Sequence, residues 1–116
     1  MSQEAVSPFH LPLRFLEPFL PGPGMEVHEI DLAPGGASLA PFKASRFTVA
    51  PGQSSPVDSH AVHEIWFFTA GSGELTYDGE AHRLAAPEAC YFAPHRTHTI
   101  RNDGEEEIAV ISLWWS

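Results

Sequence analysis

Proline and glycine punctuate this chain throughout, which favours short strands over long helices. The 116 residues include 11 prolines and nine glycines, and these separate a series of short apolar runs. Proline removes a backbone donor and interrupts helices, and glycine is typical of turns. Short strands at regular spacing are typical of a β-sandwich or a β-barrel. The sequence therefore predicts an all-β fold, and its length predicts one domain with a buried core.

Eight runs have the composition of strands: residues 27–32, 42–49, 63–69, 74–77, 80–84, 90–93, 97–101 and 107–114. Asp78 and Gly79 lie between two of these runs and form a dipeptide typical of a two-residue hairpin. Residues 1–24 come before them and combine five prolines with several large apolar side chains. We expect an extended arm there, with at most a helical turn at residues 14–17, packed on the domain or on a second subunit. The β-domain then spans residues 25–116.

The charge and the cysteine content narrow the possible partners and the compartment. Fifteen acidic and six basic residues give a net charge of −9, which disfavours binding to nucleic acid. Cys90 is the only cysteine, as fits a reducing cytosol, and its apolar neighbours predict a buried, inert thiol. No apolar stretch approaches the length of a membrane span, and the N-terminus lacks the features of a signal peptide. We therefore expect a cytoplasmic protein without a membrane partner.

Four side chains are candidates for a metal centre. Asp58, His60 and Glu64 lie at even offsets, so an extended strand would place them on one face. Strand pairing would bring His98 opposite this group. Two carboxylates and an imidazole among large apolar side chains are costly to bury unless a positive charge compensates them. A mononuclear divalent ion, held by Asp58, His60, Glu64 and His98, would supply that charge.

The donor set does not fix the ion or the role of each carboxylate. Imidazole with carboxylate accepts Fe²⁺, Mn²⁺, Zn²⁺ or Ni²⁺. If only His60, Glu64 and His98 bind, the site has the two histidines and one carboxylate of non-haem iron oxygenases. Asp58 is then either a further ligand or a group that moves protons. Glu64 is the other candidate for catalytic proton transfer.

A substrate pocket is expected beside these residues. Trp66 and Phe68 follow Glu64 on the same strand face and would form a dry wall. Phe92 suggests a partly apolar or aromatic substrate as well. His95 is either a plain turn residue or an acid/base group at the pocket rim. His63 lies at an odd offset and is expected on the exterior.

Two spaced motifs connect the chain to a known family. The first, G-x5-H-x-H-x3,4-E-x6-G, matches the spacing of Gly52, Asp58, His60, Glu64 and Gly71, with Asp58 in the place of the first histidine. The second, G-x5-P-x-G-x2-H-x3-N, matches at His98 and Asn102, whereas other residues occupy its remaining positions: Pro87, Ala93 and His95. Over roughly residues 42–114 the chain therefore resembles the cupin superfamily, specifically the small conserved barrels of the cupin 2 type.

This resemblance implies a jelly-roll β-barrel with a metal ion in its mouth and Asp58, His60, Glu64 and His98 as ligands. It also favours a homodimer. Two functions stay open. One is a metal-dependent enzyme that acts on a small organic molecule, either as an oxygenase or as an isomerase, cyclase or epimerase that transfers protons. The other is a module that binds or senses a small ligand without catalysis.

Overall fold

The computed structural model describes residues 12–116, and all regular secondary structure in this range is β-strand. The nine strands are β1 (Phe19–Gly22), β2 (Met25–Glu29), β3 (Lys43–Val49), β4 (His63–Ala70), β5 (Ser72–Tyr77), β6 (Glu80–Ala85), β7 (Glu88–Phe92), β8 (His98–Arg101) and β9 (Ile108–Trp115). The predicted all-β fold is therefore confirmed. Among the described residues, no helix is long and apolar enough to span a membrane.

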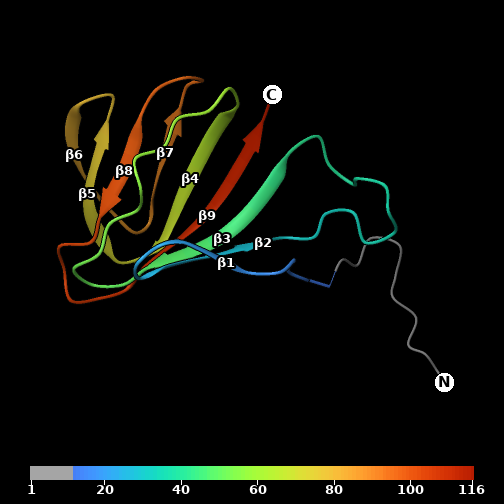
Figure 1. Cartoon of the computed structure of the whole chain (residues 1–116), viewed down its shortest axis with the longest axis horizontal. Helices are drawn as coiled ribbons and strands as arrows, with labels where there is room; N and C mark the ends of the chain where they lie inside the picture. The colour runs from blue at the N-terminus through green and yellow to red at the C-terminus, as the bar shows by residue number, and fades with distance from the viewer. Residues whose placement is uncertain (1–11) are drawn as a thin grey trace.

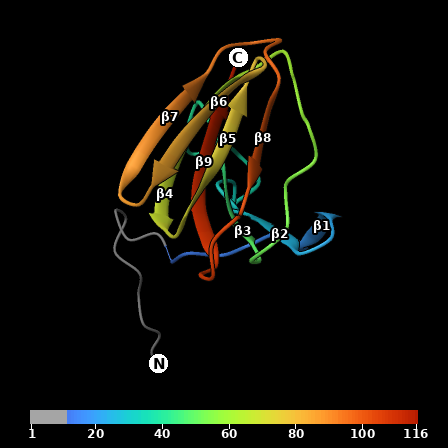
Figure 2. The ribbon, with the colours of Figure 1, turned by 90° about the vertical axis from the view of Figure 1, so that its left-hand side faces the viewer.

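The strands form two sheets that pack face to face in a jelly roll (Figures 1 and 2). One sheet has the order β1-β2-β3-β9-β4-β7 and the other has the order β6-β5-β8. Alternate residues of each strand point between the sheets, as the two-residue period of a strand requires. The resulting core consists of Met25, Val27, Phe47, Val49, Trp66, Phe68, Leu75, Phe92, Ile100, Ile108 and Val110.

The eight runs recognised in the sequence correspond to β2–β9, with ends that differ by a few residues. Asp78 and Gly79 both have positive φ, at 51° and 88°, and form the predicted tight turn between β5 and β6. The short strand β1 was missed, because its sequence Phe-Leu-Pro-Gly is that of a turn. It pairs with β2 at the edge of the larger sheet, where a proline is tolerated.

Part of the predicted N-terminal arm, residues 1–11, lies outside the described residues. The described part runs along β2 instead of forming a helical turn. Phe15 pairs with Ile30, and the amide of Leu16 donates to the carbonyl of Glu29 at 2.8 Å. The division of the chain at residue 24 stays a prediction.

A buried asparagine joins the end of β3 to the loop between β8 and β9. The Asn102 side chain is fully buried, and its amide donates to the carbonyls of Val49 at 2.9 Å and Glu106 at 2.8 Å. Its side-chain oxygen accepts from the amide of Gly104 at 3.0 Å. Asn102 thus connects the end of β3 to the segment between β8 and β9, so this motif residue is structural.

Cys90 on β7 packs against the core, and burial raises the pKa of its thiol from 9.0 to about 12. We expect the native protein to react with a thiol reagent such as DTNB about a thousandfold more slowly than an exposed cysteine at mildly alkaline pH, because only the thiolate is nucleophilic. The absorbance of the released thionitrobenzoate measures the rate. Protein unfolded in guanidinium serves as the control, and an equally fast reaction of the native protein would contradict the prediction.

Candidate metal centre

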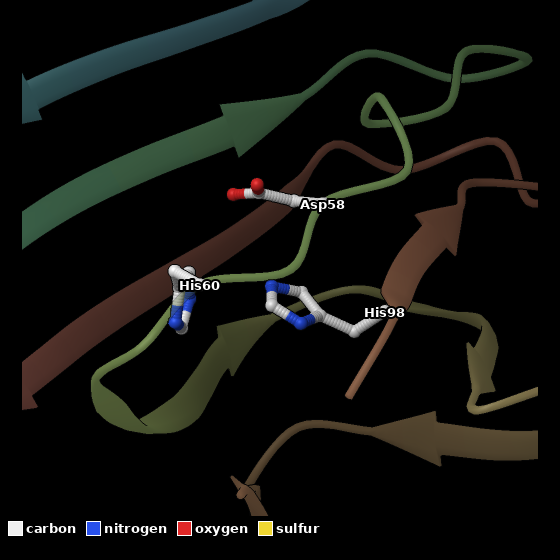
Figure 3. A group of neighbouring side chains, drawn as sticks. All are labelled: Asp58, His60 and His98. Carbon is white, nitrogen blue, oxygen red and sulfur yellow. The ribbon is translucent and has the colours of Figure 1, made fainter. Parts of the chain in front are cut away.

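The segment that precedes β4 runs antiparallel beside β8 and carries two of the candidate ligands. Ser54 pairs with Arg101, and Asp58 pairs with His98. Asp58 and His98 exchange both backbone hydrogen bonds, at 3.0 and 2.9 Å. This pairing places the Asp58 backbone directly opposite His98 at the start of β8 (Figure 3).

The extended strand that would place Asp58, His60 and Glu64 on one face does not form. β4 begins only at His63, so Asp58 and His60 lie on the preceding loop and do not share a strand face with Glu64. The loop bends after His60, where the imidazole Nδ1 donates to the carbonyl of Val62 at 3.0 Å. The amide of His95 donates to the carbonyl of His60 at 2.7 Å and fixes the bend from the other side. The candidate ligands therefore converge because the loop folds back along β8.

Asp58, His60 and His98 each offer a ligand atom, and these atoms lie within 4.8 Å of one another. Figure 3 shows the two loop side chains and the His98 ring around one common space. Asp58 is exposed, His60 is half-buried and His98 is buried. One carboxylate oxygen and two imidazole nitrogens make a donor set that suits a divalent transition metal.

Glu64 borders this cluster and is held by side chains on its other side. Its Oε1 lies 2.7 Å from Nε2 of His60 and 3.5 Å from Nε2 of His98. Its Oε2 accepts hydrogen bonds from the Trp66 indole at 2.8 Å and from the Ser112 hydroxyl. These two donors occupy Oε2, so Oε1 faces the imidazoles.

Ser112 belongs to this site but was not predicted from the sequence. It is buried on β9, in register with Trp66 on β4, and its hydroxyl reaches Glu64. A lone serine at an inward-facing position of the apolar run Ile-Ala-Val-Ile-Ser-Leu-Trp-Trp was the available signal. Buried hydroxyls need a hydrogen-bond partner, so such a serine indicates a polar group on a neighbouring strand.

The protonation of the two histidines fits a cation at this place. The Val62 carbonyl can only accept a hydrogen bond, so Nδ1 of His60 carries a proton. The other ring nitrogen, Nε2, lies towards Glu64. Burial opposes a charge on His60, but the hydrogen bond and the charge of Glu64 outweigh it and raise the pKa of this imidazole. A divalent ion would take the place of the Nε2 proton.

His98 is suited to bind as a neutral ligand. Burial lowers the pKa of His98, although the charge of Glu64 opposes this shift. Its Nε2 is the nitrogen that lies towards the cluster, 3.5 Å from Oε1 of Glu64, so the lone pair of a neutral imidazole can reach a cation there. The residues present therefore fit a divalent ion.

A cavity of about 590 Å³ opens at this centre. Its lining comprises Phe19, Pro21, Met25, Val27, Ser45, Phe47, Ser55, Pro56, Val57, Asp58, His60, Val62, Glu64, Trp66, His98 and Trp114. Of the four side chains expected at the pocket, only Trp66 belongs to this lining. Phe68 and Phe92 lie in the core, where Phe92 stacks on the His98 ring with centroids 4.3 Å apart. His95 lies exposed on a turn with a φ of 64°.

His63 lies on the opposite face of β4, as expected. Its Nδ1 is 2.6 Å from the hydroxyl of Tyr91, and its ring stacks on Trp115 with an interplanar angle of 10°. It therefore belongs to the exterior face of the larger sheet and not to the metal centre.

Comparison with known proteins identifies the family. The sequence profile of the cupin domain matches residues 45–115. The chain belongs to the cupin family. A cupin 2 conserved barrel domain protein from Salinispora arenicola is 28% identical to this cupin and superposes on it with a TM-score of 0.72. The match covers 100% of this cupin and 91% of the Salinispora chain. A predicted oxalate decarboxylase from Thermotoga maritima shares the fold at 18% identity, with a TM-score of 0.67 over 97% of this cupin and 98% of that chain.

Among curated proteins, this cupin resembles part of a much longer enzyme. The mannose-1-phosphate guanylyltransferase of Escherichia coli is 30% identical over 73 residues, which are 62% of this cupin and 15% of that enzyme. The similarity thus spans a small part of the curated relative.

Proposed function

We propose that this cupin is a metal-dependent enzyme that acts on a small organic molecule. One observation carries the proposal: Asp58, His60 and His98 bring ligand atoms within 4.8 Å of one another on the wall of a 590 Å³ cavity. Fe²⁺, Mn²⁺, Zn²⁺ and Ni²⁺ all suit these donors. When bound, such an ion supplies positive charge that polarises an oxygen atom of the substrate.

The two carboxylates have different surroundings, which suggests different roles. The indole of Trp66 and the hydroxyl of Ser112 hold Glu64, so its free oxygen keeps a fixed direction towards the histidines. Asp58 is exposed at the cavity wall. We assign Glu64 to binding and orientation, and Asp58 either to binding or to proton transfer with the substrate. Both an oxygenase and a proton-transferring isomerase, cyclase or epimerase are compatible with this assignment.

Metal loading tests the proposal. Purified protein is incubated with each of the four ions under anaerobic conditions, separated from excess ion and analysed by mass spectrometry for metal and by amino-acid analysis for protein. We expect about one ion per chain for at least one metal, and a strong loss in Asp58→Ala and His60→Ala. Wild-type protein that retains no ion after loading would exclude a metal-dependent enzyme.

A ligand-binding or sensing module is the second candidate function, and the mostly apolar lining of the cavity favours it as much as it favours an enzyme. The two functions differ in what happens to a bound molecule. Metal-loaded protein incubated with a small molecule that it binds would release a changed molecule if it is an enzyme, and the same molecule if it is a sensor.

We also propose a homodimer that uses the exterior face of the larger sheet. Phe67 and Tyr91 on this face are 41% and 48% exposed, and their strands β4 and β7 are neighbours. Large exposed apolar side chains on adjacent strands are typical of protein interfaces. Light scattering that gives the 12.7 kDa of one chain would contradict this proposal.

A further inference from the structure

The cavity at the metal centre combines an apolar wall with a single charged region. Ten of its sixteen lining residues are apolar, and two more are serines. The remaining four are the candidate ligands Asp58, His60, Glu64 and His98. Among the described residues, the ionisable groups of the cavity thus gather at one place, and the rest of the wall offers no charge to a ligand.

The basic residues of this cupin lie elsewhere. None of its six lysine and arginine side chains belongs to the cavity lining. Two of them form surface ion pairs: Arg83 with Asp103 and Arg96 with Asp78, each at 2.6 Å. The other four are Arg14, Lys43, Arg46 and Arg101. Within residues 12–116, a carboxylate or phosphate in the cavity would therefore meet no side-chain cation apart from the histidines of the centre.

The charges of the centre already balance when a divalent ion is bound. Asp58 and Glu64 contribute two negative charges, and two neutral imidazoles contribute none, so a divalent ion brings the sum to zero. An anionic group on the part of the substrate that lies away from the metal would stay uncompensated beside apolar side chains, which is unfavourable. An uncharged apolar group would instead bury apolar surface, which is favourable.

The aromatic side chains indicate the shape of that apolar group. Trp66 and Phe47 meet edge to face with centroids 5.0 Å apart, and Trp114 lies on the same wall. Towards solvent, Phe19 and Val57 continue the apolar lining and are 52% and 70% exposed. Aromatic walls of this kind pack well against flat rings.

We infer that this cupin takes a ligand with an uncharged, largely apolar body, such as an aryl group, that presents one oxygen-bearing head group to the metal centre. The inference rests on the proposed metal site and adds the substrate class. It excludes ligands whose body carries a carboxylate or a phosphate against this apolar wall.

Three hydroxamic acids with the same metal-binding head test the inference. Beside this head, acetohydroxamic acid carries only a methyl group and benzohydroxamic acid carries an uncharged phenyl ring. In 4-carboxybenzohydroxamic acid the ring also carries a negatively charged carboxylate. Their affinities for the zinc-loaded protein are measured by calorimetry. We expect benzohydroxamic acid to bind about tenfold more tightly than either of the other two, because it alone buries an uncharged ring.

A charge variant with a matched control sharpens the test. Val57→Lys places a cation on the cavity wall at an exposed position, and we expect it to strengthen binding of the carboxylated probe about fivefold. Leu39→Lys makes the same change of charge at a 61% exposed residue outside the lining and should leave this affinity unchanged.

The outcomes separate the inference from the proposed function. Protein that holds none of the four ions after loading would remove the metal site and the substrate class together, and protein that holds an ion other than zinc is titrated with that ion bound. Zinc-loaded protein that binds the carboxylated probe as tightly as benzohydroxamic acid, or binds none of the three, would overturn the substrate class and leave the metal site standing.

Discussion

His60→Ala is expected to weaken the binding of a divalent ion by about a hundredfold or more, since even residues that only orient a ligand contribute ten- to a hundredfold. The imidazole is held on one side by the Val62 carbonyl, and its other nitrogen points at the cluster with Asp58 and His98. Its removal takes away one of the two nitrogen donors. Competition with a chelating dye at neutral pH measures the affinity of wild type and variant.

His63→Ala is the matched control, because it removes an imidazole three positions away. His63 contacts Tyr91 and Trp115 on the opposite face of β4, so this variant should keep the affinity of the wild type. Circular dichroism verifies that both variants are folded. A His60→Ala protein with wild-type affinity, or equal losses in both folded variants, would show that the ion does not bind at this centre.

Asn102→Ala is expected to reduce the free energy of unfolding by about 3 kcal/mol, since it leaves buried backbone groups without partners. The Asn102 side chain makes three hydrogen bonds to the backbone of Val49, Gly104 and Glu106. The residue is fully buried, so water does not readily replace these bonds. Urea denaturation followed by tryptophan fluorescence measures the change.

The neighbouring residue provides the comparison for this variant. Asp103→Ala removes a bidentate ion pair with Arg83 in which both side chains are largely exposed. Exposed ion pairs contribute under about 1 kcal/mol. If Asn102→Ala destabilises the protein no more than Asp103→Ala, then the buried hydrogen bonds of Asn102 are not what holds these segments together.

The strands of this fold were predictable because their apolar residues alternate and turn residues separate them. β4 illustrates this: Glu64, Trp66 and Phe68 point inward, and His63 and Phe67 point outward. β1 was not predictable, since Pro21 and Gly22 have poor strand propensity and the strand exists only through its pairing with β2.

The spacing of polar residues indicated the members of the centre but not its construction. Alternation tells which face of a strand a side chain occupies, and it does not tell how deep along the sandwich that side chain lies. Glu64 and Phe68 share a face, yet Glu64 reaches the cavity and Phe68 lies in the core. The role of Ser112 depends on the register between β4 and β9, which no local pattern reveals.

The loop that carries Asp58 and His60 also covers an open sheet edge. β8 is the outermost strand of the smaller sheet, and the loop pairs with its backbone at His98, Ile100 and Arg101. Uncovered edges of this kind recruit strands from other chains and lead to aggregation. Substitutions that loosen this loop and change ligand binding would therefore expose the unpaired backbone of β8. The need to avoid aggregation thus limits which substitutions in this segment can evolve a new ligand specificity.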